Sequence, residues 1–244
     1  MFLLLVFKFI LGLIIGSFIA ALSWRFPRGI SNLSGRSFCD NCKKQLSWYD
    51  NIPLLSYLIL GGRCRNCKKS ISPRYFIIES VTAIGFTLIG FQIIPLILFC
   101  ILEIIFIIDL ENQIIPDDFV FLGIIVAIFN FKLDCITSCA IFSNLLAGFL
   151  SASFLLLIHL VTRGRGMGLG DVKFAVLAGM IVGLPLSPIW MLIAFLTGAM
   201  CGIILILGGS AGLKSKIAFG PFLIFSIPVT LLWGQKIIDL MLLH

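Results

Sequence analysis

The stretch LILFCILEIIFIIDLENQIIPDDFVFLGIIVAIFNF, residues 96–131, gives the clearest indication of the fold class. It contains two apolar runs, 96–110 and 118–131, joined by a short acidic connector that includes a proline. Within a bilayer, a helix satisfies all of its backbone polar groups, whereas an isolated strand or loop cannot. The stretch therefore predicts two membrane helices with an acidic turn between them.

The composition indicates that the whole chain, and not only this stretch, belongs in a membrane. The 244 residues are 60% hydrophobic and 12% charged, with a mean hydropathy of +1.15. A soluble domain would carry about 25% charged residues, so a soluble helical protein is the poorer interpretation. We expect an all-α polytopic membrane protein with about eight transmembrane helices of roughly 20 residues each. The expected spans lie near residues 2–23, 76–94, 96–110, 118–131, 138–161, 174–186, 188–208 and 219–243.

Three parts are expected along the chain. Residues 1–23 form a first span, read as uncleaved because a basic start and a small-residue cleavage site are both lacking. Residues 24–75 are the one long polar segment, and residues 76–244 form a membrane core of about seven spans.

Basic residues indicate the orientation. If residues 24–75 are cytoplasmic, alternation of the spans places 15 of the 18 Lys and Arg residues on the same side. Such a bias is typical of cytoplasmic segments. The net charge of +7 is explained by this bias, so we expect a lipid bilayer as partner and no nucleic acid.

The polar segment carries a metal-binding pattern. CDNC at 39–42 and CRNC at 64–67 are separated by 21 residues. Two such pairs can supply the four thiolates of a tetrahedral zinc site, and cytoplasmic thiols stay reduced, which disfavours two disulfides. We expect one structural zinc, because four thiolates leave no position for a reactive water. The ligands are Cys39, Cys42, Cys64 and Cys67.

Two carboxylates are candidates for catalysis. Asp109 is expected at the inner end of one span and Asp171 at the inner start of another, 62 residues further on. Gly168 and Gly170 carry no side chain that would keep a peptide away from Asp171. Each aspartate taken alone could merely mark the end of a span. Together they could share a proton and activate water against an amide, in a chain with only two histidines and no HExxH motif.

Several segments resemble the type IV prepilin peptidases, membrane aspartyl proteases of the GxGD class. GLGD at 168–171 and DLENQIIPD at 109–117 are similar to the two signature segments of that family. GSFIAALSWRFPRG, the cysteine-bearing segment 39–75 and FGPF at 219–222 extend the resemblance over most of the chain.

The resemblance implies a particular activity. Asp109 and Asp171 would be the catalytic pair, and Asp117 would support them. Members of the family cleave the leader of prepilins or secretion pseudopilins after a Gly, at the cytoplasmic face of the bacterial inner membrane. They then methylate the new N-terminal residue with S-adenosylmethionine. No residue pattern in this chain indicates where that cofactor binds.

The directions of the helices suggest how the pair divides its work. A helix end close to Asp109 would be a C-terminus, whereas Asp171 lies at an N-terminus. The helix dipole then favours a protonated Asp109 as the acid and an ionised Asp171 as the base, and Lys173 adds to that bias.

Two other functions fit the same residues. A proton-coupled carrier would use its ionisable groups near the middle of the bilayer, whereas Asp109 and Asp171 are expected at one face. A membrane scaffold would bind a partner through the zinc segment and would not depend on either aspartate.

Overall fold

The computed structural model describes residues 2–30, 37–39, 41–133, 138–209, 212 and 217–242. Within these ranges the structure is helical, and its only extended pairings are two isolated bridges, Phe38 with Gln45 and Arg63 with Ser70. The chain divides into two compact units, Met1–Ile104 and Ile105–His244. The boundary falls inside one helix, α4 (Ile93–Asn112). The all-α architecture expected from the sequence is confirmed.

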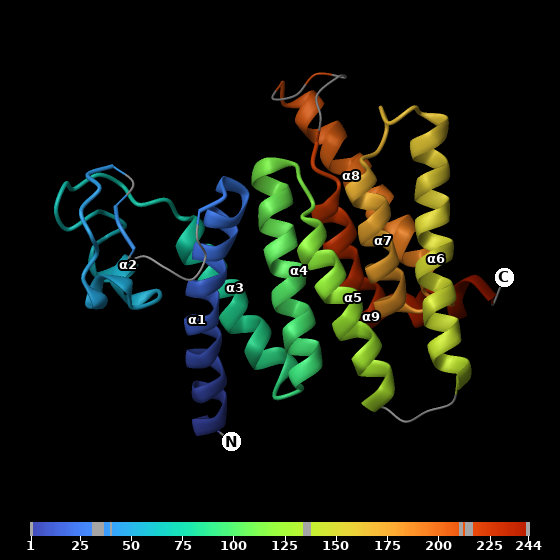
Figure 1. Ribbon diagram of the computed structural model, residues 1–244, viewed down its shortest axis with the longest axis horizontal. Coiled ribbons are helices and arrows are strands. Elements are labelled where there is room, and N and C mark those ends of the chain that lie inside the picture. The colour runs from blue at the N-terminus through green and yellow to red at the C-terminus, as the bar shows by residue number, and fades with distance from the viewer. Residues whose placement is uncertain are drawn as a thin grey trace. The chain divides into compact units, whose positions relative to one another are not determined.

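The first unit contains a pair of packed helices, which flank the cysteine segment in the sequence. Helix α1 (Phe2–Arg25) runs into a short 3-10 turn, η1 (Phe26–Arg28), and packs along α3 (Arg74–Ile89) (Figure 1). The intervening segment contains only a 3-10 turn, η2 (Trp48–Asn51), and a single helical turn, α2 (Leu55–Ile59).

Glycines allow α1 and α3 to approach closely. A Cβ atom on Gly12 would lie 2.6 Å from the Cα atom of Ala83, and one on Gly16 would lie 2.9 Å from the Cα atom of Glu79. Small residues at such a seam let helix backbones pack together inside a membrane. At the end of α1, Arg74 donates hydrogen bonds to the Ala20 carbonyl at 2.8 Å and to the Ser23 hydroxyl at 2.7 Å.

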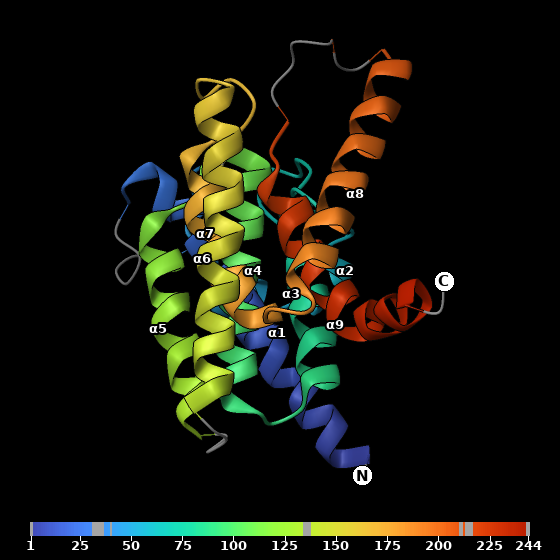
Figure 2. The same ribbon diagram turned by 90° about the vertical axis from the view of Figure 1, so that its right-hand side faces the viewer.

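The second unit is built around α7 (Leu169–Val182). This helix contacts α5 (Asp117–Leu133), α6 (Ser138–Val161), α8 (Ser187–Leu207) and α9 (Gly220–Leu242). Figures 1 and 2 show α6 running beside α7 in both views. Most of α7 is buried. Because it is surrounded by other helices, it can hold a charged group away from lipid.

Glycines again set the closest contact in this unit. A Cβ atom on Gly148 would lie 2.6 Å from the Val176 carbonyl oxygen, and one on Gly179 would lie 2.8 Å from the Ala147 carbonyl oxygen. Helices α8 and α9 are joined by the Trp190 indole, whose Nε1–H donates to the Leu223 carbonyl at 2.8 Å.

Five helices in the described ranges are long and apolar enough to cross a membrane: residues 2–28, 93–112, 141–161, 187–207 and 220–241. Helices α3, α5 and α7, of 16, 17 and 14 residues, are shorter than the roughly 20 residues of a full span. A multi-pass membrane protein is therefore supported, while the sequence-based count of eight spans stays a prediction. The outward faces of the long helices are apolar, as contact with lipid requires.

Candidate active site and metal centre

The cysteine segment folds into two knuckles of the same design. In each, the first cysteine exchanges backbone hydrogen bonds with the residues four and five positions later: Cys39 with Lys43 and Lys44, and Cys64 with Lys68 and Lys69. Lys43 and Lys68 both adopt a positive φ, 57° and 58°. That conformation closes each tight turn and brings the two sulfur atoms of each pair together.

The four thiols form one cluster. The Sγ atoms of Cys39, Cys42, Cys64 and Cys67 all lie within 4.8 Å of one another. The backbone N–H of Lys69 lowers the pKa of the Cys67 thiol to about 6, which favours the thiolate that a metal requires. Four convergent sulfur ligands of this kind fit a tetrahedral zinc ion. The expected metal ligands are therefore brought together.

Reciprocal contacts tie the two knuckles to each other. The Asn41 amide reaches the Cys67 sulfur at 3.6 Å, and the Asn66 amide reaches the Cys42 sulfur at 3.8 Å. Each asparagine oxygen accepts a hydrogen bond from a lysine of the opposite knuckle, at 2.9 Å from Lys69 and 3.1 Å from Lys44. The sequence C-x-N-C-K-K occurs twice, at residues 39–44 and 64–69, and this repeat indicates that the two knuckles are alike. The hydrogen bonds between the two knuckles were not predicted from it.

Asp109 occupies the last turn of α4, where its backbone carbonyl accepts a hydrogen bond from the Gln113 N–H at 2.8 Å. Its side chain is only 4% exposed. The Oδ2 atom is buried and has no hydrogen-bond partner among the residues that the structure describes. A buried carboxylate oxygen without a partner is costly, so it indicates a group kept for function.

Asp171 lies in the first turn of α7. The sequence predicted that this helix begins near residue 174, whereas it begins at Leu169, so Asp171 is part of the helix. Its Oδ2 atom accepts a hydrogen bond from the Gly168 N–H at 3.1 Å, a capping contact at the helix N-terminus. The side chain is 9% exposed. The hydrogen bond from Gly168 and the N-terminal end of α7 both favour the ionised form of the Asp171 carboxylate.

The two aspartates belong to one site. One residue, Ile115, lies against the glycines beside both of them. A Cβ atom on Gly170 would be 3.0 Å from Ile115 Cβ, and one on Gly220 would be 3.2 Å from Ile115 Cδ1. Topology therefore brings together the two carboxylates that the sequence placed at one face of the membrane.

The glycines next to the two aspartates differ in how much space a side chain would find there. A Cβ atom on Gly168 would lie at an ordinary 3.4 Å from Asp171 Oδ2. A Cβ atom on Gly220 would lie only 2.5 Å from Asp109 Oδ2. The sequence singled out Gly168 and Gly170 but did not connect Gly220 with Asp109, although FGPF was recognised as a motif.

Lys173 pairs with Asp117. Its Nζ atom lies 2.6 Å from Asp117 Oδ2, and both side chains are about half exposed. This ion pair connects the start of α5 with the start of α7. Asp117 follows Asp109 by eight residues, and Lys173 follows Asp171 by two. The sequence named both residues as supporting without predicting their contact.

The glycine-rich loop before Asp171 is anchored. His159 Nδ1 and the Met167 carbonyl oxygen are 2.7 Å apart, and the Gly166 N–H donates to the Thr162 hydroxyl at 3.2 Å. Gly164 adopts a φ of 73°, which glycine takes without strain. These contacts fix the path of the chain into α7 and therefore the position of Asp171.

The site contains two buried carboxylates at the ends of apolar helices, and the chain also carries a cluster of four thiols. These features are those of a membrane aspartyl peptidase, and this is the class of protein that the fold and the site indicate. Residues 10–93 match the family model of the bacterial peptidase A24 N-terminal domain. Residues 96–203 match that of the type IV leader peptidase family.

Similar proteins agree with these matches. A Pseudomonas aeruginosa protein named prepilin leader peptidase/N-methyltransferase is 32% identical over 93% of this chain and 90% of its own length. Proteins of the same name from Legionella pneumophila and Aeromonas hydrophila are each 34% identical, over 84% and 83% of this chain and 74% and 73% of their own lengths. No solved structure gives a significant match. The chain belongs to the type IV leader peptidase family.

Proposed function

We propose that this chain is a prepilin leader peptidase in which Asp109 and Asp171 cleave the peptide bond. The observation that carries the proposal is the convergence of these two buried carboxylates, one of them with an unpartnered oxygen, from distant segments of the chain. Neither a carrier nor a scaffold is favoured by the family to which the chain belongs.

The proposed reaction assigns one role to each aspartate. Ionised Asp171 takes a proton from a water molecule, whose oxygen attacks the scissile carbonyl carbon, while protonated Asp109 donates its proton to the carbonyl oxygen. The tetrahedral intermediate then loses a hydroxyl proton to Asp109, Asp171 protonates the amide nitrogen, and the C–N bond breaks. The two groups would titrate as a coupled pair.

The structure supplies reasons for this division. The Gly168 N–H already neutralises part of the charge on Asp171 Oδ2. Asp109 lies in the last turn of α4, where the C-terminal helix end favours the protonated acid that can donate to a substrate oxygen.

We also propose that the thiol cluster binds one structural zinc. Four thiolates saturate a tetrahedral ion, so the metal would hold the two knuckles together and take no part in hydrolysis. In a segment with little helix and a small core, metal binding would provide much of the folding free energy.

The substrates would be prepilins or pseudopilins at the cytoplasmic face of a bacterial inner membrane. The support is the excess of Lys and Arg in the segments that would face the cytoplasm. The relatives' name also assigns an N-methyltransferase activity, and we propose that this chain methylates the amine that cleavage exposes, with S-adenosylmethionine as donor.

A cleavage assay tests the peptidase. Purified protein in detergent is incubated with a prepilin, and the Asp109→Asn and Asp171→Asn variants are compared with wild type. Each variant should lose cleavage, because an amide keeps the shape of the carboxyl group but cannot exchange the proton. Asp239→Asn is the matched control, since Asp239 is an exposed aspartate of α9 that contacts Gln235. Full cleavage by Asp171→Asn would overturn the proposal.

A further inference from the structure

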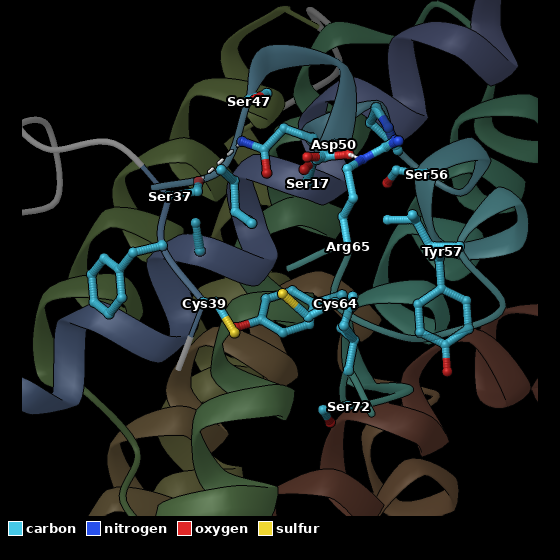
Figure 3. Close-up of a pocket in the computed structure, with 18 of the residues that line it drawn as sticks. Ser17, Ser37, Cys39, Ser47, Asp50, Ser56, Tyr57, Cys64, Arg65 and Ser72 are labelled. Carbon is cyan, nitrogen blue, oxygen red and sulfur yellow. Dashed lines mark hydrogen bonds and ion pairs between the residues drawn. The ribbon is translucent and has the colours of Figure 1, made fainter. Parts of the chain in front are cut away.

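The first unit contains a cavity that the peptidase chemistry does not use. Its volume is about 690 Å³, which is within the range of small-molecule sites. The walls come from the C-terminal half of α1, the turn around η2 and α2, the two cysteine knuckles and the start of α3. Figure 3 shows Cys39 and Cys64 at one side of this cavity, with Arg65 reaching to Asp50.

One wall of the cavity carries a buried carboxylate, Glu79 of α3, which is 7% exposed. Its Oε2 atom accepts a hydrogen bond from the Leu54 N–H at 2.8 Å. Leu54 has a φ of 59°, an uncommon conformation for a residue with a side chain. Glu79 therefore holds the turn that forms one side of the cavity, and it brings a negative charge to the wall.

Aromatic side chains line much of the remaining surface: Trp24, Phe38, Tyr49, Tyr57 and Tyr75. Rings of this kind attract cations over their faces and stack on planar heterocycles. A carboxylate together with several aromatic rings is the chemistry that recognises a ligand carrying both a positive charge and a flat ring.

Basic groups lie at other positions of the wall. Lys44, Lys69 and Arg25 line the cavity; Lys44 and Lys69 each donate one hydrogen bond to an asparagine and keep further N–H donors that can meet a carboxylate of a ligand. Arg65 is already engaged by Asp50 at 2.9 Å, where the aspartate side chain is only 9% exposed. The cavity thus offers separate places for a cation, an anion and an aromatic ring.

We propose that this cavity is the S-adenosylmethionine site of the chain, an inference that rests on the methyltransferase half of the proposed function. The cofactor combines a sulfonium cation, an adenine ring and an amino acid carboxylate, which match the carboxylate, the aromatic rings and the basic groups of the wall. When bound, it supplies a methyl group: the lone pair of a neutral amine forms the new N–C bond, the C–S bond leaves its electrons on sulfur, and the amine releases a proton.

The residues of the chain then have distinct roles. Glu79 would hold the cation of the cofactor, and Tyr49 would provide an aromatic surface for its ring. The zinc would keep the wall in place by fixing the two knuckles.

Binding of S-adenosylmethionine, measured directly by equilibrium dialysis with labelled cofactor, tests the assignment. Glu79→Gln removes the charge but leaves an oxygen that can still accept the Leu54 N–H. It should weaken binding about tenfold to one-hundredfold, as expected for the loss of a charge-assisted contact. Glu103→Gln is the matched control, because Glu103 is also 7% exposed, is held by Thr82 at 2.9 Å, and does not line the cavity. It should bind as wild type does.

A second pair of variants guards against a folding defect in the first. Tyr49→Ala should weaken binding about threefold to thirtyfold through the loss of an aromatic contact. Trp233 of α9, an aromatic residue that is 51% exposed and does not line the cavity, supplies the control Trp233→Ala. Metal content and prepilin cleavage are measured in every variant, and both should stay at the wild-type level.

The possible outcomes separate this inference from the peptidase proposal. Wild-type protein that cleaves prepilin but does not bind S-adenosylmethionine would overturn the inference and leave the peptidase intact. Equal affinity in wild type, Glu79→Gln and Tyr49→Ala would overturn the assignment to this cavity. Wild-type protein that neither cleaves nor binds would overturn both proposals.

Discussion

The contact between Gly220 and Asp109 gives a sharp test of the active-site geometry. Gly220 is the first residue of α9, and a Cβ atom there would lie 2.5 Å from Asp109 Oδ2 and 3.1 Å from its Cγ. Contacts of a real Cβ atom are ordinary only from 3.4 Å. Gly220→Ala must therefore displace the Asp109 carboxyl group by about 0.9 Å, or push the start of α9 away by a similar distance.

The expected effect falls mainly on catalysis. A misplacement of about 1 Å in a reacting group can cost on the order of 100-fold in rate. Overpacking a core costs about 1–3 kcal/mol in stability, and the better helix propensity of alanine returns up to about 1 kcal/mol of that. We expect kcat for prepilin cleavage to fall about 100-fold, with KM little changed and the protein still folded.

The assay compares Gly220→Ala with Gly202→Ala, a glycine of α8 whose Cβ atom would meet Ile217 Cδ1 at an ordinary 3.7 Å. Initial rates of prepilin cleavage and thermal melting in detergent are measured for both. Cleavage by Gly220→Ala within about twofold of Gly202→Ala, with both proteins folded, would refute the reasoning that the position of Asp109 is critical.

Four further substitutions test neighbouring features. Cys64→Ser should lose the zinc, measured by elemental analysis, while leader cleavage persists because the aspartates lie on other segments; one zinc per chain in the variant would contradict this. Gly170→Ala should slow cleavage, because its Cβ atom would lie 3.0 Å from that of Ile115; an unchanged kcat would show that the two glycine contacts do not set the geometry. Lys173→Met and Asp117→Asn should each lower the free energy of unfolding by less than about 1 kcal/mol, because both side chains are about half exposed; a loss above about 2 kcal/mol in denaturation curves would contradict that estimate.

Local patterns in the sequence were enough to predict the all-α architecture and the cluster of four cysteines. Apolar runs mark helices regardless of what surrounds them, and the C-x-x-C spacing defines each knuckle within a few residues. The early start of α7 was missed because hydropathy disregards the polar first turn. A capping signal was present, since Asp171 stands three residues after Gly168, the N-cap position.

Contacts between distant segments could not be read from the sequence. The approach of Gly220 to Asp109 depends on how α9 packs, and the pairing of Lys173 with Asp117 depends on the contact of α5 with α7. The cavity beside Glu79 was likewise hidden, because its walls come from five separate parts of residues 14–79. Such features follow from tertiary packing, for which the chain carries no short-range pattern.

Single-turnover cleavage of a prepilin by Asp109→Asn, Asp171→Asn and the double variant tests whether the two aspartates act as a catalytic pair. Residues that act as a unit lose nearly everything when either is removed. The account predicts that each single variant falls by about 100-fold to 10,000-fold and that the double variant is no slower. Partial losses that multiply in the double variant, or a wild-type rate in either single variant, would contradict a shared catalytic pair.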